Sequence, residues 1–304
     1  MNGGVKRRIF AAIAAMCIVM SAAGCGSTEV SSSVEKHTAT SNAEENNVAE
    51  SVESIGDMSE ITDSNNEESD LPYYFKKVRE CTYRIEDGAN VVFIGNSLTR
   101  FGDLPLYFEK MFADRNVTVT SECCDGFAFV DLQQAITEKE EWLAALRDAD
   151  VVILQGYGGE FDAEPMEKLL DEATHLKQAY FFVNDFCTEN VMEYKLTEEV
   201  ENGLKNFKYD IAPLGWGFVS ADLYNIFGDD FYQQDGYHPT QVNGLLTSLY
   251  FYEVLTGESC ENAEYTQLPS TINMFGGEEA LEDLMQQGKK VIDDFYDLSM
   301  GIEK

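Results

Sequence analysis

Short apolar or alternating runs recur between residues 91 and 214, and segments with a helical period separate them. Continuous apolar runs are typical of strands buried on both faces, and strands that alternate with helices pair in parallel. We therefore predict an α/β domain: a three-layer α/β/α sandwich with a mainly parallel, doubly wound sheet of about five strands. The predicted strands are residues 91–95, 117–124, 151–155, 180–184 and 209–214. The predicted helices are residues 106–113, 132–147, 166–177, 198–206, 241–255 and 278–296.

Residues 1–24 have the pattern of an export signal. A basic start precedes an apolar stretch, residues 9–23, which at about 15 residues is short for a membrane-spanning helix. Small residues then stand directly before Cys25. This ending resembles the bacterial lipoprotein signal, although Ala22 replaces the usual leucine, and the resemblance implies that Cys25 is lipidated and becomes the N-terminus. An ordinary secretory signal and an uncleaved anchor are the alternatives.

Residues 25–72 separate this signal from the part of the chain with a core composition. Between residues 26 and 70 there is no aromatic residue, and 12 acidic residues stand against Lys36 alone. Such a segment cannot bury enough apolar surface to offset the entropy lost on ordering, so we predict a disordered acidic tether. The tether would hold a single domain, residues 73–304, outside the cytoplasm and away from the membrane.

The charge of the chain limits its partners. The formal net charge is −34 at pH 7. Nucleic acids and anionic membrane surfaces attract positive charge, so we expect neither as a partner of the domain. The charge does not argue against a neutral small-molecule ester or a polysaccharide. The protein would still meet the membrane through the lipid on Cys25.

Five cysteines follow the predicted lipidation site: Cys81, Cys123, Cys124, Cys187 and Cys260. Free, buried thiols are the favoured interpretation. A disulfide between Cys81 and Cys260 stays open in an exported protein. Adjacent cysteines on a strand point to opposite faces, so Cys123 and Cys124 should not share a metal ion, and we predict no metal site.

Ser97 is the leading candidate for a nucleophile. The first predicted strand stops at Gly95, and Ser97 follows two residues later. The carboxyl ends of strands in an open α/β sheet are where such folds bind their ligands. A nucleophilic serine also needs a base, a group that orients the base, and hydrogen-bond donors for an oxyanion.

His238 is the candidate base among the chain's three histidines. His37 lies in the predicted tether, and His175 lies in a predicted surface helix. Asp235 precedes His238 by three residues in a turn-rich segment, a spacing that lets its carboxylate reach the imidazole Nδ1. An Asp-x-x-His pair is common by itself, and a helix cap with a polar loop histidine is the alternative.

Together these segments resemble the SGNH, or GDSL-type, serine esterases. The block Gly95-Asn96-Ser97-Leu98-Thr99 is similar to the first block of that family, and Asp235-Gly236-Tyr237-His238-Pro239 is similar to its last. The likeness extends over most of the chain after residue 85. It implies the flavodoxin-like SGNH fold and a triad of Ser97, His238 and Asp235. The Gly-x-Ser-x-Gly pattern of the competing hydrolase fold is absent around Ser97.

The resemblance also implies which groups hold the oxyanion. Besides the Ser97 backbone N–H, the family uses a glycine N–H in its second block, which corresponds to Gly126. The family's asparagine in the third block is replaced here by Gln155, whose amide is one methylene longer. Asn184, after the fourth predicted strand, is the rival for that role.

Three further residues are expected beside the substrate. Asn96 adjoins the serine, Tyr157 follows the third predicted strand, and Trp216 follows the fifth. Trp216 would form the wall of an acyl pocket or stack on a sugar ring. A core aromatic is the alternative for this residue.

These residues predict hydrolysis of carboxylic esters through an acyl-enzyme, without a metal or an organic cofactor. Export and the habit of the family favour acetyl esters on carbohydrate. Two other functions use the same fold. One is a catalytically silent glycan-binding or adhesion lipoprotein, and the other is an O-acyltransferase in which a sugar replaces water as the acceptor.

Overall fold

The computed structural model describes residues 71–156, 161–183, 196–263, 265, 272 and 275–302. These residues lie in the second of the two units of the chain, Asn66–Lys304. The predicted signal, most of the predicted tether and Cys25 lie outside the described residues, and so do Tyr157, Asn184 and Cys187. Within the described ranges, no helix combines the length and the apolar character needed to cross a membrane.

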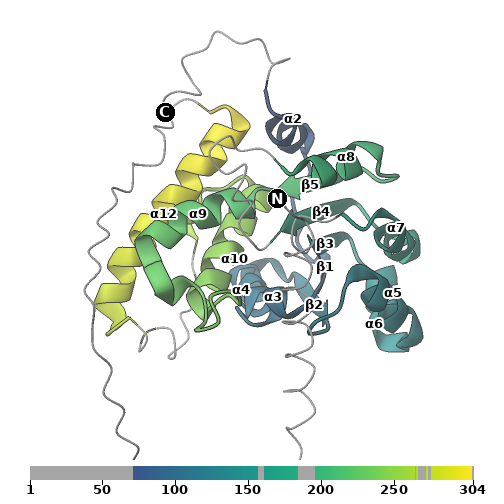
Figure 1. The fold of residues 1–304 in the computed structure, drawn as a ribbon, viewed down its shortest axis with the longest axis horizontal. Helices are drawn as coiled ribbons and strands as arrows, with labels where there is room; N and C mark the ends of the chain where they lie inside the picture. Colours follow the sequence, from purple (N-terminus) through teal and green to yellow (C-terminus); the bar gives the residue numbers. More distant parts are fainter. Residues whose placement is uncertain are drawn as a thin grey trace, which may run out of the picture. The chain divides into compact units, whose positions relative to one another are not determined.

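One parallel sheet of five strands forms the centre of this unit (Figure 1). The strands are β1 (Asn90–Gly95), β2 (Thr118–Cys123), β3 (Val151–Gly156), β4 (Gln178–Val183) and β5 (Ile211–Leu214). Their order is β2-β1-β3-β4-β5, which is the order of flavodoxin-like sheets. The direction of winding reverses between β1 and β3, so the carboxyl ends of these two strands border the crevice where such sheets bind ligands.

Helices cover both faces of the sheet, which confirms the predicted three-layer α/β/α sandwich (Figure 1). One layer contains α5 (Phe129–Glu138), α6 (Glu140–Arg147), α7 (Ala163–Glu172) and α8 (Glu198–Asn206). The other contains α4 (Leu104–Met111), α9 (Trp216–Phe227), α10 (Gln241–Thr256) and α12 (Glu278–Met300). The first helix of the described residues, α2 (Tyr73–Glu80), contacts β5 and α12.

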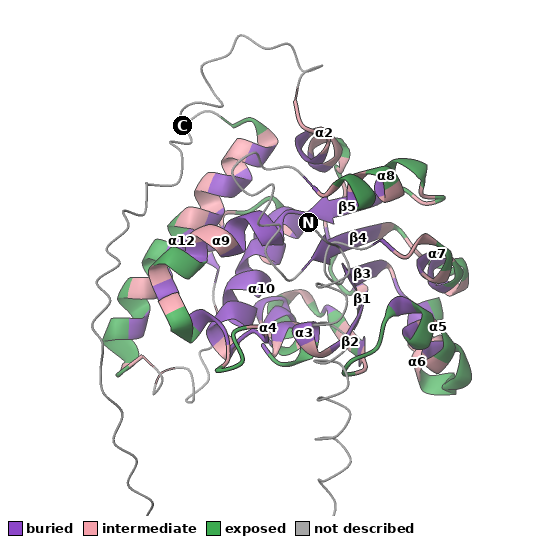
Figure 2. Ribbon diagram, viewed as in Figure 1, coloured by how far each residue is buried: buried purple, intermediate pink, exposed green. Residues whose placement is uncertain are grey.

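The core fills both sides of the sheet, and aromatic rings contact one another on the α4–α10 side. Phe93 of β1 contacts Phe108 of α4 and Phe251 of α10, with ring centroids 5.3 and 6.4 Å apart. Strand β3 is buried along its whole length, and α10 is buried over most of its surface (Figure 2). Apolar burial on this scale is the main source of stability, and it makes the carboxyl ends of β1 and β3 a rigid platform.

The predicted helices differ from the structure in two places. Residues 132–147 form two helices, α5 and α6, because the backbone at Lys139 is extended (φ −107°, ψ 111°). Helix α7 ends at Glu172, so His175 lies in an exposed turn and not in a helix.

Helix α9 was not predicted at all. Its first residues, 216–220, are all buried and its sequence is largely apolar, so it lacks the amphipathic period by which helices are found. Its first residue is Trp216, two residues after the end of β5.

The described cysteines are free, which favours the thiol interpretation over a Cys81–Cys260 bridge. Cys260 is fully buried and packs in the core, whereas Cys81 is half-buried. Buried thiols of this kind behave as small apolar side chains.

Candidate active site

Ser97 is the first residue of α3 (Ser97–Arg100), a single turn of helix directly after β1. Asn96 caps this turn: its side-chain Oδ1 accepts the Leu98 N–H at 3.0 Å, and its carbonyl accepts the Thr99 N–H at 3.1 Å. The cap fixes a sharp strand-to-helix turn. Ser97 therefore stands at the carboxyl end of β1, beside the point where the sheet reverses its winding.

Gly95, the last residue of β1, permits this turn. A Cβ atom at position 95 would lie 2.6 Å from the Thr99 hydroxyl oxygen and 2.9 Å from Oε1 of Gln155. Both distances are far shorter than ordinary van der Waals contact, so a larger residue would displace the turn that carries Ser97. Steric crowding therefore explains why position 95 is occupied by glycine.

The three residues predicted as a triad form one chain of hydrogen bonds. Nε2 of His238 lies 3.0 Å from Oγ of Ser97, and Nδ1 of His238 lies 2.6 Å from Oδ2 of Asp235. Oδ1 of Asp235 accepts the backbone N–H groups of Tyr237 and His238, each at 3.0 Å. The aspartate is thus held by its own turn while it holds the imidazole.

Asp235 stays ionised in this position. Burial alone would raise its pKa, but the hydrogen bonds from the His238 ring and from the N–H groups of His238 and Tyr237 outweigh burial and hold the pKa below its usual value. A carboxylate on Nδ1 selects the imidazole tautomer whose Nε2 accepts a proton. The arrangement can therefore draw the proton from the Ser97 hydroxyl.

The ring of Phe101 packs against the imidazole of His238. Its ring centroid lies 4.6 Å from that of His238, and the Arg100 guanidinium lies 4.7 Å from the Phe101 ring. His238 is only 9% exposed, while Phe101 is 37% exposed. Phe101 shields the histidine and presents an apolar surface to solvent beside Ser97.

Gly126 lies in the turn after β2. Its φ of +73° is in the left-handed region that favours glycine, and nothing lies within 4 Å of where a Cβ would be. Within the part of the chain that the structure describes, neither the Ser97 N–H nor the Gly126 N–H donates a hydrogen bond. Their role as oxyanion donors stays a prediction.

Arg100 and Asp125 connect the two donor-bearing segments. The Arg100 guanidinium donates to both carboxylate oxygens of Asp125, with 2.8 Å between Nε and Oδ1. Arg100 is the last residue of α3, and Asp125 immediately precedes Gly126. Sequence reasoning missed this pair, because nothing local relates residue 100 to residue 125 before the register of β1 and β2 is known.

The side chain of Gln155 binds the turn that carries Ser97. Its side chain is 2% exposed, and its Oε1 accepts the Asn96 N–H and the Thr99 hydroxyl, each at 3.1 Å. Its Nε2 donates to the Gly156 carbonyl. The Oε1 of this amide therefore binds the turn that carries Ser97, and a role of the second Nε2 N–H as an oxyanion donor stays a prediction. The extra methylene lets Gln155 reach across from β3 to the neighbouring strand.

The other predicted contacts with substrate also change. Asn96 is 5% exposed, and its side chain caps α3 and donates to the Phe127 carbonyl at 3.4 Å, so it serves the turn. Trp216 is fully buried and packs against Phe231 and Tyr250, so it is a core aromatic. Tyr157 and Asn184 lie outside the described residues.

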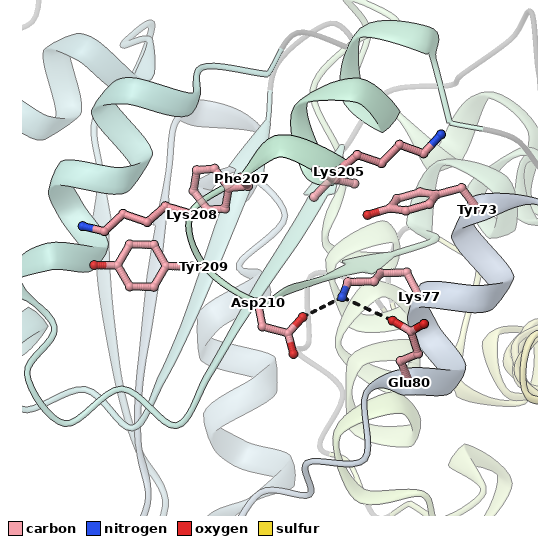
Figure 3. Close-up of a pocket in the computed structure, with 9 residues that line it drawn as sticks. Tyr73, Lys77, Glu80, Lys205, Phe207, Lys208, Tyr209 and Asp210 are labelled. Atoms are coloured by element: carbon pink, nitrogen blue, oxygen red, sulfur yellow. Dashed lines mark hydrogen bonds and ion pairs between the residues drawn. The ribbon is translucent and has the colours of Figure 1, made fainter.

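The surface of the described residues includes a groove and a smaller hollow. A groove of about 1150 Å³ is lined by residues between Tyr224 and Thr240, and Asp235 is the triad residue among them. A second hollow of about 380 Å³ lies between α2 and the segment that leads into β5 (Figure 3). In that hollow Lys77 is paired with Asp210 and Glu80. Because residues 207–210 precede β5, this hollow lies at the edge of the sheet opposite to Ser97.

No family model matches the chain, and no curated protein matches it. Solved structures do. A DUF4886 family protein from Bacteroides uniformis ATCC 8492 is 14% identical, with a TM-score of 0.51, over 71% of this chain and 96% of that chain.

Two lipases give weaker matches. A putative GDSL-like lipase from Parabacteroides merdae ATCC 43184 is 13% identical, with a TM-score of 0.41, over 57% of this chain and 97% of that one. The lipase Lip_vut3 from a goat rumen metagenome is 14% identical, with a TM-score of 0.38, over 55% and 97%. The likeness to the DUF4886 family protein is one of fold.

Proposed function

We propose that this protein is a serine esterase that cleaves carboxylic esters through Ser97, His238 and Asp235. The observation that carries the proposal is the unbroken hydrogen-bond chain from Oγ of Ser97 through the imidazole to the Asp235 carboxylate. Two residues far apart in sequence, Ser97 and His238, meet at 3.0 Å at the carboxyl end of the sheet. If Asp235 were only a helix cap and His238 only a polar loop residue, Nε2 of His238 would not need to lie within hydrogen-bond distance of Ser97.

The first half of the reaction forms an acyl-enzyme. Nε2 of His238 takes the proton of the Ser97 hydroxyl as Oγ attacks the ester carbonyl carbon. Asp235 stabilises the imidazolium ion that results. The tetrahedral intermediate then collapses: the bond from carbon to the alcohol oxygen breaks, and His238 gives its proton to the leaving alcohol.

The negative oxygen of the intermediate would be held by the backbone N–H groups of Ser97 and Gly126. Both belong to backbone that is fixed before substrate arrives: the cap of Asn96 orders the first, and the Arg100–Asp125 pair ties down the segment of the second. Preorganised donors of this kind are usually the largest electrostatic contribution to acyl transfer.

The second half of the reaction regenerates the serine. His238 takes a proton from water, the resulting hydroxide attacks the acyl carbon, and the acyl group leaves as a carboxylic acid while Ser97 recovers its proton. If a sugar hydroxyl replaced water, the same steps would transfer the acyl group to that sugar. We propose acetyl groups on carbohydrate as the substrate.

The test uses the full-length protein and p-nitrophenyl acetate. We expect release of p-nitrophenol by the wild type and a rate at background for Ser97→Ala and His238→Ala. A fluorophosphonate probe should label Ser97 and leave Ser97→Ala unlabelled. Equal rates for the wild type and Ser97→Ala, or no labelling of Ser97, would favour the silent glycan-binding module.

We also propose that the protein acts outside the cytoplasm, attached to the membrane by a lipid on Cys25. The basic and apolar start of the chain, followed by small residues before Cys25, supports this placement. Incorporation of labelled palmitate into the wild type and its loss in Cys25→Ala would agree with it. Labelling that persists in Cys25→Ala would contradict it.

A further inference from the structure

The orienting aspartate does not fix the distance between Ser97 and His238. Asp235 lies three residues before His238 and holds the imidazole from the same turn, so the two residues move together. Ser97 belongs to a different part of the chain, 141 residues away, at the end of β1. The 3.0 Å between Nε2 of His238 and Oγ of Ser97 therefore depends on contacts that join these two segments.

Two buried glycines bring the segments into backbone contact. Gly102 follows the helical turn that begins at Ser97, and Gly244 lies in the first turn of α10, shortly after His238. A Cβ atom at position 244 would overlap the carbonyl oxygen of Gly102 and would lie 3.0 Å from its Cα. Because these are backbone atoms and not the end of a flexible side chain, position 244 requires glycine at this separation.

A hydrogen bond closes the same contact beside the glycines. Nε2 of Gln241, the first residue of α10, donates to Oδ2 of Asp103 at 2.7 Å. Asp103 stands at the N-cap of α4, where a carboxylate usually accepts an N–H of its own helix, yet its side chain makes no capping bond there. Its φ of +54° lies in the left-handed region, which is uncommon for residues other than glycine. The carboxylate of Asp103 thus binds α10 in place of its usual capping role.

Phe101 joins the two segments at the imidazole itself. Its ring centroid lies 4.6 Å from that of His238. The Phe101 N–H donates to the Ser97 carbonyl at 2.9 Å, and the Asp103 N–H donates to the Arg100 carbonyl at 3.0 Å. Because hydrogen bonds run without a break from the nucleophile to Asp103, a displacement of this segment reaches both Ser97 and the ring that packs on His238.

We propose that the contact between residues 101–103 and the start of α10 sets the distance between the nucleophile and its base. This α10 contact consists of Gly102 against Gly244 and of the hydrogen bond from Gln241 to Asp103. Asp103 and Gln241 are positioning residues, since they act through Ser97 and His238. The inference rests on the esterase function proposed for Ser97. A displacement of a catalytic group by about 1 Å can cost about 10² in rate, so a contact of this kind matters for kcat.

The first experiment inverts the Asp103–Gln241 pair in the full-length protein. Gln241→Glu places two carboxylates within hydrogen-bond distance, and their repulsion should separate residues 101–103 from α10. We expect kcat for p-nitrophenyl acetate to fall about tenfold with less than about a twofold change in KM, because the catalytic groups move and the substrate contacts do not. Adding Asp103→Asn restores a hydrogen bond, since its amide donates to the new carboxylate, and kcat should return to within about threefold of the wild type.

Gln286→Glu is the matched control for the change of charge. Nε2 of Gln286 donates to the Glu282 carboxylate at 2.8 Å on α12, so this substitution brings the same two groups together away from the triad. It should keep the wild-type kcat, and urea unfolding of each variant separates a loss of rate from a loss of folding. The proposal is overturned if Gln241→Glu keeps the wild-type kcat, or if adding Asp103→Asn recovers none of the loss.

The two glycines provide an ordered pair of variants. A Cβ at position 102 would lie 3.1 Å from the Cα of Gly244, which a small shift relieves, whereas a Cβ at position 244 would overlap the Gly102 carbonyl oxygen. Gly102→Ala should therefore lower kcat less than Gly244→Ala does, and the reverse order would contradict the proposal. If Gly244→Ala does not fold, the inverted pair decides the question.

An NMR measurement separates this inference from the esterase proposal, because it needs no substrate. The Phe101 ring current shifts the resonances of the His238 C–H protons, so these resonances report where residues 101–103 lie. The chain has three histidines, and His238→Ala identifies the signals. Gln241→Glu should move them toward their position in Phe101→Leu, and adding Asp103→Asn should return them.

The two proposals then fail in different ways. If the wild type hydrolyses no ester but the His238 signals respond as expected, the esterase proposal fails and the α10 contact stands. If the wild type hydrolyses p-nitrophenyl acetate and the signals of Gln241→Glu match those of the wild type, the α10 contact fails alone.

Discussion

The guanidinium group of Arg100 forms a two-point ion pair with the carboxylate of Asp125, with 2.8 Å between Nε and Oδ1. The pair connects the end of the short helix that begins at Ser97 to the residue before Gly126. Both side chains are about half exposed, at 51% and 41%. Exposed pairs of this kind add little to stability, typically about 0–1 kcal/mol, so its value lies in the geometry that it imposes.

Replacing Arg100 should therefore affect the rate more than the fold. We expect Arg100→Ala to lower kcat for p-nitrophenyl acetate about tenfold with a smaller change in KM, because the Gly126 N–H loses its fixed position. This loss is below the roughly 10²–10³ of removing an oxyanion donor outright. Arg100→Lys should recover part of the rate. Steady-state kinetics and urea unfolding together test this, and a loss of stability that accounts for the loss of rate would contradict a positioning role.

Replacing Gln155 should affect the stability more than the rate. Gln155→Ala removes the acceptor of the Asn96 N–H and of the Thr99 hydroxyl in a buried site. We expect the free energy of unfolding to fall by about 1–3 kcal/mol or more, the usual cost of orphaned buried groups. Thr99→Val, which removes only one of the two donors, should cost less. A Gln155→Ala variant with wild-type stability and a kcat that falls about 10²–10³ would instead support Gln155 as an oxyanion donor.

Asp235→Asn should lower kcat by as much as ~10⁴ and leave KM nearly unchanged, because an amide on Nδ1 favours the wrong tautomer of His238. The pH dependence has a definite sign. The folded pKa of Asp235 lies below its ordinary value, so its stabilising contribution is present above about pH 4 and is lost as the pH falls through the folded pKa. The difference in Tm between wild type and variant should shrink in acid, and a difference that grows in acid would be inconsistent with an ionised Asp235.

Glu122 on β2 is fully buried, and neither carboxylate oxygen has a hydrogen-bond partner within the described part of the chain. Burial raises its pKa to about 8, with Lys139 acting in the other direction. The folded state therefore holds a proton that the unfolded chain loses above about pH 4.5. Stability must fall as the pH rises from the unfolded pKa to the folded one.

Glu122→Gln should remove this pH dependence. Urea unfolding at pH 5 and pH 9 should show the variant gaining stability relative to wild type at the higher pH, by up to about 4 kcal/mol. Burial raises the pKa of Glu253 to about 8 as well. The quantity to compare is therefore the free energy of unfolding of the variant minus that of the wild type. If this difference is the same at pH 5 and pH 9, Glu122 is ionised in the folded protein.

Local patterns in the sequence determined the sheet and the nucleophile–base pair. The five strands were predicted from short apolar or alternating runs, which can be recognised without knowledge of distant residues. Asp235 and His238 were found for a similar reason, since three residues of turn suffice to bring the carboxylate to the ring. Ser97 was found from its place at the end of a strand.

The tertiary structure decided what depends on neighbours across the sheet. The Arg100–Asp125 pair and the engagement of Gln155 with Asn96 both cross between strands, so they follow from the register of β1 with β2 and β3. Helix α9 and the burial of Trp216 depend on packing against other aromatic rings. Hydrophobic periodicity indicates which side of a segment is buried. It does not indicate which residues that side contacts, because those contacts form only when the chain has folded.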